Sequence, residues 1–263
     1  MKKLMVSALT AALSAALLVG VMGCAKKESS ATVYDLVSHG TSNYFVVVDI
    51  TADKKGDVKK IKIDEVMLAE WWAKQAKEGE NSSFSDTILA DDNTAYAKYV
   101  QIGDKKLQAT GVTGSGSNAK LTYAALDDSF ADLTAELKTD KALQKVYYDA
   151  AKAGIFKILK KTGDDAYEVE KDGKNNDYGS LFKSTSTYWQ GETYPLGWKG
   201  NIKAMEDYVK EYGVKYTSAD LNDIEPVDGK FYLTDVNTGA TIGGFAGYMT
   251  VVKAAFDQAM QSF

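Results

Sequence analysis

The chain has 263 residues, of which 45% are hydrophobic and 25% are charged, a composition typical of globular proteins. All 31 basic residues are lysine, against 36 acidic residues, and the net charge is −5. Proteins that bind nucleic acid carry a band of basic residues on one face, so an acidic chain without arginine argues against such a partner. One cysteine and one histidine exclude an internal disulfide, a cysteine-ligated iron–sulfur cluster and a multi-histidine metal site. We therefore expect no nucleic-acid partner and no metal centre.

The N-terminus has the pattern of an export signal. Lys2 and Lys3 precede an apolar stretch that runs to Val21, and Gly23-Cys24 follows, ahead of polar residues. A signal that ends in small residues is removed on export. The boundary resembles the bacterial lipobox, in which the cysteine becomes the acylated first residue of the mature protein. Cys24 is then the lipidation site, and the alternative is a plain transmembrane anchor.

Cleavage at this boundary leaves 240 residues, with 29 lysines against 36 acidic residues and a net charge near −7. We assign residues 1–23 to a lipoprotein signal peptide, 24–33 to a polar tether and 34–263 to the folded domain. The predicted localisation is the extracytoplasmic face of a bacterial membrane, held there by a lipid anchor.

The first predicted elements are two strands, Tyr44–Ile50 and Val58–Val66, because β-branched and aromatic residues flank a turn-forming segment. They predict a hairpin with one buried face. The spacing of apolar residues next predicts a helix over Met67–Lys77 and a polar loop over 78–94. Two further strands are expected at Tyr96–Ile102 and Lys106–Val112.

The second half of the chain alternates helical spacing with turn-rich segments. Amphipathic spacing covers Leu121–Ile158, and residues 162–180 are rich in turn formers. The last predicted elements are a helix over Ile202–Tyr212 that ends at Gly213, a short strand at Phe231–Leu233 and a helix over Phe245–Met260. These elements predict an α+β fold in which helices pack on a small antiparallel sheet.

One motif stands between the last predicted strand and the last predicted helix: Asp235-Val236-Asn237-Thr238-Gly239-Ala240-Thr241. It resembles the D-x-x-[ST]-G-A-T flavinylation signature of the FMN-binding domain family. That family includes subunits of sodium-pumping and Rnf-type redox complexes and flavin-carrying surface lipoproteins. In it the last threonine is esterified by the phosphate of FMN, a role that the resemblance assigns to Thr241. The resemblance also implies that the modifying enzyme recognises Asp235.

The residue types of the motif suit a phosphoester. Gly239 and Ala240 allow the backbone to approach a phosphate, and Thr241 supplies the hydroxyl that the ester needs. Thr238 could donate a further hydrogen bond to the phosphate. A helix that begins near Thr241 would point its unpaired N–H groups and its positive dipole end at the phosphate. The alternative is a strand-to-helix turn with a threonine N-cap and no ligand.

A flavin ring needs an aromatic floor, and the segment from Tyr188 to Trp198 concentrates large rings between glycine and proline residues. Trp189 and Trp198 are the candidate residues for contact with the ring. Their alternative role is in the hydrophobic core.

The resemblance implies an FMN-binding-domain-like fold over about residues 40–66 and 180–263. Residues 67–180 are then a large, partly helical insertion or a degenerate second unit. The implied function is electron transfer, with covalent FMN passing electrons between membrane-bound or extracellular redox partners rather than acting on a substrate of its own. An FMN transferase is the implied modifying partner. The alternative is a surface lipoprotein that binds a solute or a partner without flavin and uses the aromatic segment as its cleft.

Overall fold

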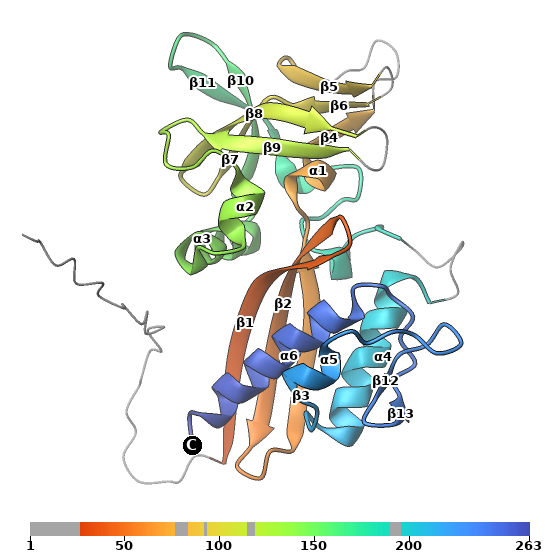
Figure 1. Cartoon of the computed structure of the whole chain (residues 1–263). Helices are drawn as coiled ribbons and strands as arrows, with labels where there is room; N and C mark the ends of the chain where they lie inside the picture. The colour runs from red at the N-terminus through yellow and green to blue at the C-terminus, as the bar shows by residue number, and fades with distance from the viewer. Residues whose placement is uncertain (1–26, 77–83, 92–93, 115–118, 190–195) are drawn as a thin grey trace, which may run out of the picture.

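The computed structural model describes residues 27–76, 84–91, 94–114, 119–189 and 196–263. Over these residues the fold is mixed α+β, with several small antiparallel sheets and six α-helices (Figure 1). Buried apolar residues form two clusters. We call residues 27–66 and 182–263 the base unit and residues 67–181 the inserted unit. The predicted signal peptide and Cys24 lie outside the described residues.

The base unit is built on a three-stranded antiparallel sheet, in the order β1 (Glu28–His39), β2 (Ser42–Asp53) and β3 (Val58–Val66). Alternate residues of β2 enter different clusters: Val46 packs in the base-unit core, whereas Val47 packs in the core of the inserted unit. The prediction of one buried face is therefore wrong for β2, because the inserted unit covers the face that the hairpin alone would leave to solvent.

Two long helices cover one face of this sheet, α6 (Phe245–Met260) against β1 and β2, and α4 (Gly197–Tyr212) against β3 (Figure 1). Gly213 ends α4 with φ 75°, a conformation that favours glycine. The connection between the helices holds α5 (Ser218–Leu221) and a two-stranded hairpin, β12 (Tyr232–Leu233) with β13 (Val236–Asn237). The predicted bounds of β3 and α6 are confirmed.

The predicted tether of residues 24–33 is wrong from Glu28 onward, because β1 begins there. Its first residues are polar, and they pair with the end of β2 across the sheet. Ser30 bonds to Thr51 at 2.8 Å and Thr32 donates to Asp49 at 2.5 Å on the exposed face. Backbone pairing and these cross-strand contacts stabilise the polar start of the strand, which carries no hydrophobic signal of its own.

The inserted unit has a five-stranded sheet in the order β11-β10-β7-β8-β9 and a three-stranded sheet in the order β4-β6-β5. Its strands are β4 (Lys74–Ala76), β5 (Thr87–Asp91), β6 (Thr94–Ala97), β7 (Tyr99–Ile102), β8 (Lys105–Thr113), β9 (Lys120–Ala125), β10 (Phe156–Lys161) and β11 (Tyr167–Asp172). Its helices are α1 (Ala69–Trp72), α2 (Leu133–Leu137) and α3 (Lys141–Ala153), with a 3₁₀ turn, η3, at Gly173–Asn175.

Several predictions for the inserted unit are wrong. The helix expected over Met67–Lys77 is only the four residues of α1, followed by β4, and the loop expected over 78–94 contains β5. The helical stretch expected over Leu121–Ile158 holds β9 and the start of β10 as well as α2 and α3. Strands of three to six residues are too short to show a period, so pairing with distant partners decides their conformation.

The inserted unit leaves and rejoins the base unit at one point of the sheet. The Met67 N–H donates to the Leu181 carbonyl at 2.9 Å, and Val66 forms an isolated β-bridge with Phe182. Next to this junction lies a second 3₁₀ turn, η4 (Lys183–Thr185). Helix α3 also packs against β1. The two units therefore share a core through β1 and β2 as well as this double crossing.

Candidate functional site

The sequence motif begins in the tight turn between β12 and β13. Leu233 pairs with Val236, and the two residues between them, Thr234 and Asp235, have φ values of 50° and 63°. Two successive positive φ values are the pattern of a type I′ turn, which suits a two-residue hairpin. The Asp235 side chain is exposed at the tip of the hairpin, where another protein could reach it.

Thr238 serves the loop itself. It is buried, its Oγ1 donates to the Phe231 carbonyl at 2.8 Å, and the same oxygen accepts from the Ala240 N–H at 3.3 Å. The single hydroxyl proton of Thr238 is donated inside the loop, so a phosphate hydrogen bond from Thr238 would require this contact to break. Gly239 follows with φ 76°, a backbone conformation that favours glycine.

Thr241, in contrast, has an exposed side chain on a fixed backbone. Its N–H donates to Asn201 Oδ1 at 2.6 Å, and its Oγ1 donates to the same oxygen at 3.2 Å. Asn201 is buried in α4 and donates from Nδ2 to the Gly197 carbonyl at 2.7 Å. The amide therefore holds Thr241 in place through both its N–H and its hydroxyl, while the residue itself stays exposed.

The helix after the motif begins at its predicted first residue, and therefore not near Thr241 as the helix-dipole argument for the phosphate requires. Helix α6 begins at Phe245, whose N–H donates to the Ile242 carbonyl at 3.0 Å, so three residues separate Thr241 from the first helical residue. We call residues 242–244, between Thr241 and α6, the glycine link. Its two glycines have no side chain, so the rings of His39 and Tyr44 can approach the backbone closely. A Cβ at Gly243 would lie 2.9 Å from His39 Nε2, and one at Gly244 would lie 3.4 Å from the Tyr44 ring.

The two tryptophan candidates lie in different environments. Trp198 is 1% exposed in the base-unit core, where its Nε1 donates to the Tyr248 hydroxyl at 3.2 Å. This burial favours the alternative of a core residue. Trp189 is partly buried at the edge of the same core, with φ 43°, and its carbonyl accepts from the Trp198 N–H at 3.2 Å. Residues 190–195 of the aromatic segment lie outside the described residues.

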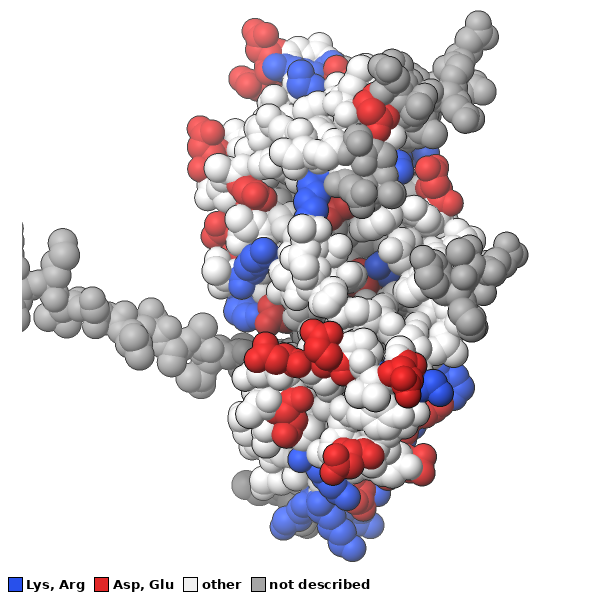
Figure 2. Space-filling model, turned by 45° about the vertical axis from the view of Figure 1, so that its right-hand side comes forward, with Lys and Arg blue, Asp and Glu red and all other residues white. Residues whose placement is uncertain are grey.

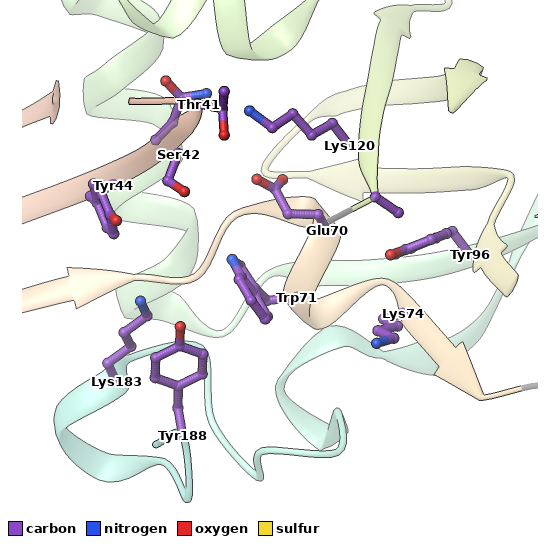
Figure 3. A pocket seen from close by; sticks show the side chains of 12 residues that line it. Thr41, Ser42, Tyr44, Glu70, Trp71, Lys74, Tyr96, Lys120, Lys183 and Tyr188 are labelled. Atoms are coloured by element: carbon purple, nitrogen blue, oxygen red, sulfur yellow. The ribbon is translucent and has the colours of Figure 1, made fainter. Parts of the chain in front are cut away.

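A pocket of about 360 Å³ opens where the two units meet (Figure 3). Its base-unit wall comes from the β1–β2 turn, the start of β2, η4 and Tyr188; its other wall comes from α1, β4, β6 and the start of β9. The lining residues are Thr41, Ser42, Asn43, Tyr44, Glu70, Trp71, Lys74, Tyr96, Ala119, Lys120, Lys183 and Tyr188. We call it the junction pocket, and Tyr44 joins it to the glycine link after Thr241.

A buried ion pair forms the base-unit side of this pocket. Lys183 Nζ lies 2.7 Å from Glu65 Oε1, and each side chain is 2% exposed. The Lys183 ammonium also lies 4.0 Å from the centroid of the Tyr188 ring. The second Glu65 oxygen accepts from the Tyr248 hydroxyl. Burial and the adjacent Glu65 charge raise the pKa of Tyr248 well above its usual value, so this hydroxyl stays a donor.

The opposite side of the pocket carries Glu70, whose carboxylate points toward Lys120 (Figure 3). Burial raises the pKa of Glu70 to about 6, although the charges of Lys120 and Lys183 act in the opposite direction. Burial also raises the pKa of Tyr96 to about 12. The pocket thus combines aromatic rings, lysine ammonium groups and one carboxyl that titrates near neutral pH.

No sequence pattern identifies Asn201 or most of the junction pocket, and His39 is expected from the sequence only as a surface or packing residue. Asn201 is 40 residues from Thr241, and His39 is about 200 residues from Gly243, with no motif to connect them. Among the described residues no group of three or more histidine, cysteine, aspartate or glutamate side chains could hold a metal ion. No helix within the described ranges is both long and apolar enough to cross a membrane.

Comparison of the chain with protein-family models, with curated proteins and with solved structures finds no match.

Proposed function

We propose that the protein is an electron carrier that is lipid-anchored at the outer face of a bacterial membrane and bears FMN esterified to Thr241. The observation that carries this proposal is the contrast within the motif. Thr238 is buried and hydrogen-bonded inside its loop, whereas Thr241 is an exposed residue whose N–H and hydroxyl both donate to Asn201. One threonine is thus accessible to an external enzyme, and it is the one that the signature specifies.

The local structure fits a phosphate ester at this oxygen. An FMN transferase would bind the exposed hairpin at Asp235 and move FMN from an activated flavin donor to Thr241. The threonine oxygen forms the new bond to phosphorus, the leaving group of the donor takes the electron pair of the broken bond, and the hydroxyl proton is released. Gly243, two residues after Thr241, leaves room for the His39 imidazole beside it.

Within the described residues, the junction pocket is the best binding site for the flavin ring. Its volume lies within the range of small-molecule sites, and Tyr44 connects it to the link that follows Thr241. Trp71 and Tyr188 meet edge to face at 5.2 Å in its wall and offer flat surfaces for a ring system. Bound FMN supplies one- and two-electron chemistry, while these side chains hold it and exclude water.

The fold of the base unit supports the same proposal. A small antiparallel sheet with two helices on one face, interrupted by an insertion, is the arrangement expected of an FMN-binding-domain-like fold. The lipobox at Cys24 would keep the carrier at the membrane, where membrane-bound or extracellular redox partners reach it.

The decisive experiment is coexpression with an FMN transferase, followed by denaturation and mass measurement of the tryptic peptide 231–253. We expect the FMN increment on the native chain, its loss in Thr241→Val, and its partial retention in Thr241→Ser, which keeps a hydroxyl. Thr241→Val is a matched change because valine has nearly the shape of threonine. A native chain that never carries the increment, although transferase and donor are competent, would overturn the proposal.

The junction pocket also favours a second function, the binding of a free aromatic solute by a surface lipoprotein. Both functions predict quenching of Trp71 fluorescence when a flavin fills the pocket. They differ after denaturing precipitation, since a solute is released and esterified FMN stays on the chain. A chain that binds riboflavin reversibly, equally well with and without the Thr241 hydroxyl, would support the solute-binding function.

A further inference from the structure

One end of the base unit carries a group of exposed lysines that the electron-transfer proposal does not use. Lys54 and Lys55 lie in the β2–β3 turn, Lys210 is in the last turn of α4, and Lys215 follows that helix. Lys55, Lys210 and Lys215 line one shallow cleft. Lys27 stands directly before β1. We call these five residues the lysine end; Figure 2 shows blue side chains gathered at the lower end of the molecule.

The lysine end differs in charge from the acidic chain that surrounds it. Its five lysines make no salt bridge within the described residues. The neighbouring Asp53 and Asp57 already pair with Lys59, at 2.8 and 3.5 Å. Glu28 and Glu211 also lie near this end, and Glu206, one turn before Lys210 in α4, interacts with the Lys210 charge. With Lys59, six lysines face five carboxylates at this end, so it is slightly positive on a protein whose mature chain is near −7.

The same end is where the chain arrives from its predicted anchor. Strand β1 begins at Glu28, and Glu28 pairs with Asp53 next to the lysine-bearing turn. Cys24 precedes Glu28 by four residues, which span at most about 14 Å when fully extended. An acylated Cys24 therefore holds the lysine end within that distance of the bilayer surface.

We propose that the lysine end docks on the anionic headgroups of the membrane to which the protein is anchored. The inference rests on the lipid anchor of the proposed function. Clusters of lysine next to a membrane anchor are attracted by anionic lipids, and the attraction acts only within about a Debye length of the surface. The connection to Cys24 is short enough to let the lysine end come within that range, about 8–10 Å at 0.1–0.15 M salt. The flexible tether of ten residues that the sequence predicts would leave the protein free to rotate relative to the membrane.

Docking at this end orients the functional site. Asn201, which holds Thr241, and Lys210 stand nine residues apart in α4, a rise of about 13 Å along the helix axis. Thr241 and the junction pocket then face away from the membrane. The redox partner consequently meets the carrier from the aqueous side, as a soluble protein or the exposed domain of a membrane complex.

The test uses the chain from residue 25 onward, which lacks the acylation site, and phosphatidylcholine vesicles with and without phosphatidylglycerol. We expect cosedimentation with the anionic vesicles at low salt and its loss at high salt. Lys54→Glu/Lys55→Glu and Lys210→Glu/Lys215→Glu should each lower the partition coefficient at least tenfold. The matched control, Lys138→Glu/Lys161→Glu, makes the same charge change on exposed residues of the inserted unit and should retain more than half of the binding.

Equal losses in the lysine-end and control variants would overturn the proposal, because binding would then follow net charge alone. Absence of any preference for anionic vesicles would overturn it too. Far-ultraviolet circular dichroism of each variant separates a lost surface from a lost fold. Membrane fractionation of Cys24→Ala tests the anchor separately: a soluble variant that still binds anionic vesicles at low salt supports both the anchor and the lysine end.

Discussion

The base unit and the inserted unit differ in how their elements are built. The base unit has two strands of 12 residues and two helices of 16, and it holds the motif, the lysine end and the Thr241 contact to Asn201. Most strands of the inserted unit have three to six residues. Long elements hold single side chains at defined positions, whereas the inserted unit contributes a wall of the junction pocket. Thr241 and this wall of the pocket thus belong to different units.

The two units are nevertheless coupled through residues at their boundary. Lys183 lies where the inserted unit ends, pairs with Glu65 of β3, and lies 5.9 Å from the centroid of the Trp71 ring in α1. Strand β2 sends alternate side chains into both cores. Three predictions test whether this coupling is as strong as the contacts indicate.

The largest effect is expected for Lys183→Met, which breaks the ion pair at the boundary. Removal of one partner leaves Glu65 buried and uncompensated, so we expect a loss of about 3–5 kcal/mol in the free energy of unfolding. Urea denaturation measures it. Lys145→Met, in the exposed pair with Asp149, is the control and should cost below about 1 kcal/mol. An equal loss in the free energy of unfolding for Lys183→Met and Lys145→Met would show that the boundary ion pair does not couple the two units.

The second prediction compares neighbouring residues of β2. Val46→Ala and Val47→Ala remove the same two methyl groups from the base-unit core and the inserted-unit core, and each should cost about 2 kcal/mol. Because β2 is shared, we expect one unfolding transition in both variants, shifted equally in far-ultraviolet circular dichroism and tryptophan fluorescence. Two separated transitions, with Val46→Ala moving only one, would mean that the units unfold independently.

The smallest effect concerns pH and Glu70 in the junction pocket. Its folded pKa is raised to about 6 from 4.5, so the folded protein binds this proton more tightly than the unfolded chain. Stability should therefore be highest below about pH 4.5 as far as Glu70 is concerned, and should fall by about 1–2 kcal/mol as the pH rises through 6. Glu70→Gln should remove this slope, whereas Glu225→Gln, an exposed control, should not. A slope that persists in Glu70→Gln would assign the titration elsewhere.

The sequence reveals elements whose signals are local. The bounds of β3 and α6 follow from the periods of their apolar residues, and Gly213 marks the end of α4 with a residue that tolerates positive φ. The motif is equally local, because its seven consecutive residues, 235–241, point to Thr241, which the structure shows to be exposed. Short strands such as β5 were missed because five residues show no reliable period.

Tertiary structure alone decides what those local elements can do together. Asn201 meets Thr241 only because α4 and α6 pack on one sheet, and Trp198 is a core residue only because Tyr248 lies against it. The junction pocket and the buried pair of Lys183 with Glu65 likewise join segments more than 100 residues apart. Such contacts follow from strand pairing and helix packing across the whole chain, so no window of the sequence contains them. The sequence by itself points to Thr241 and predicts an anchor at Cys24; tertiary structure decides that Asn201 holds Thr241.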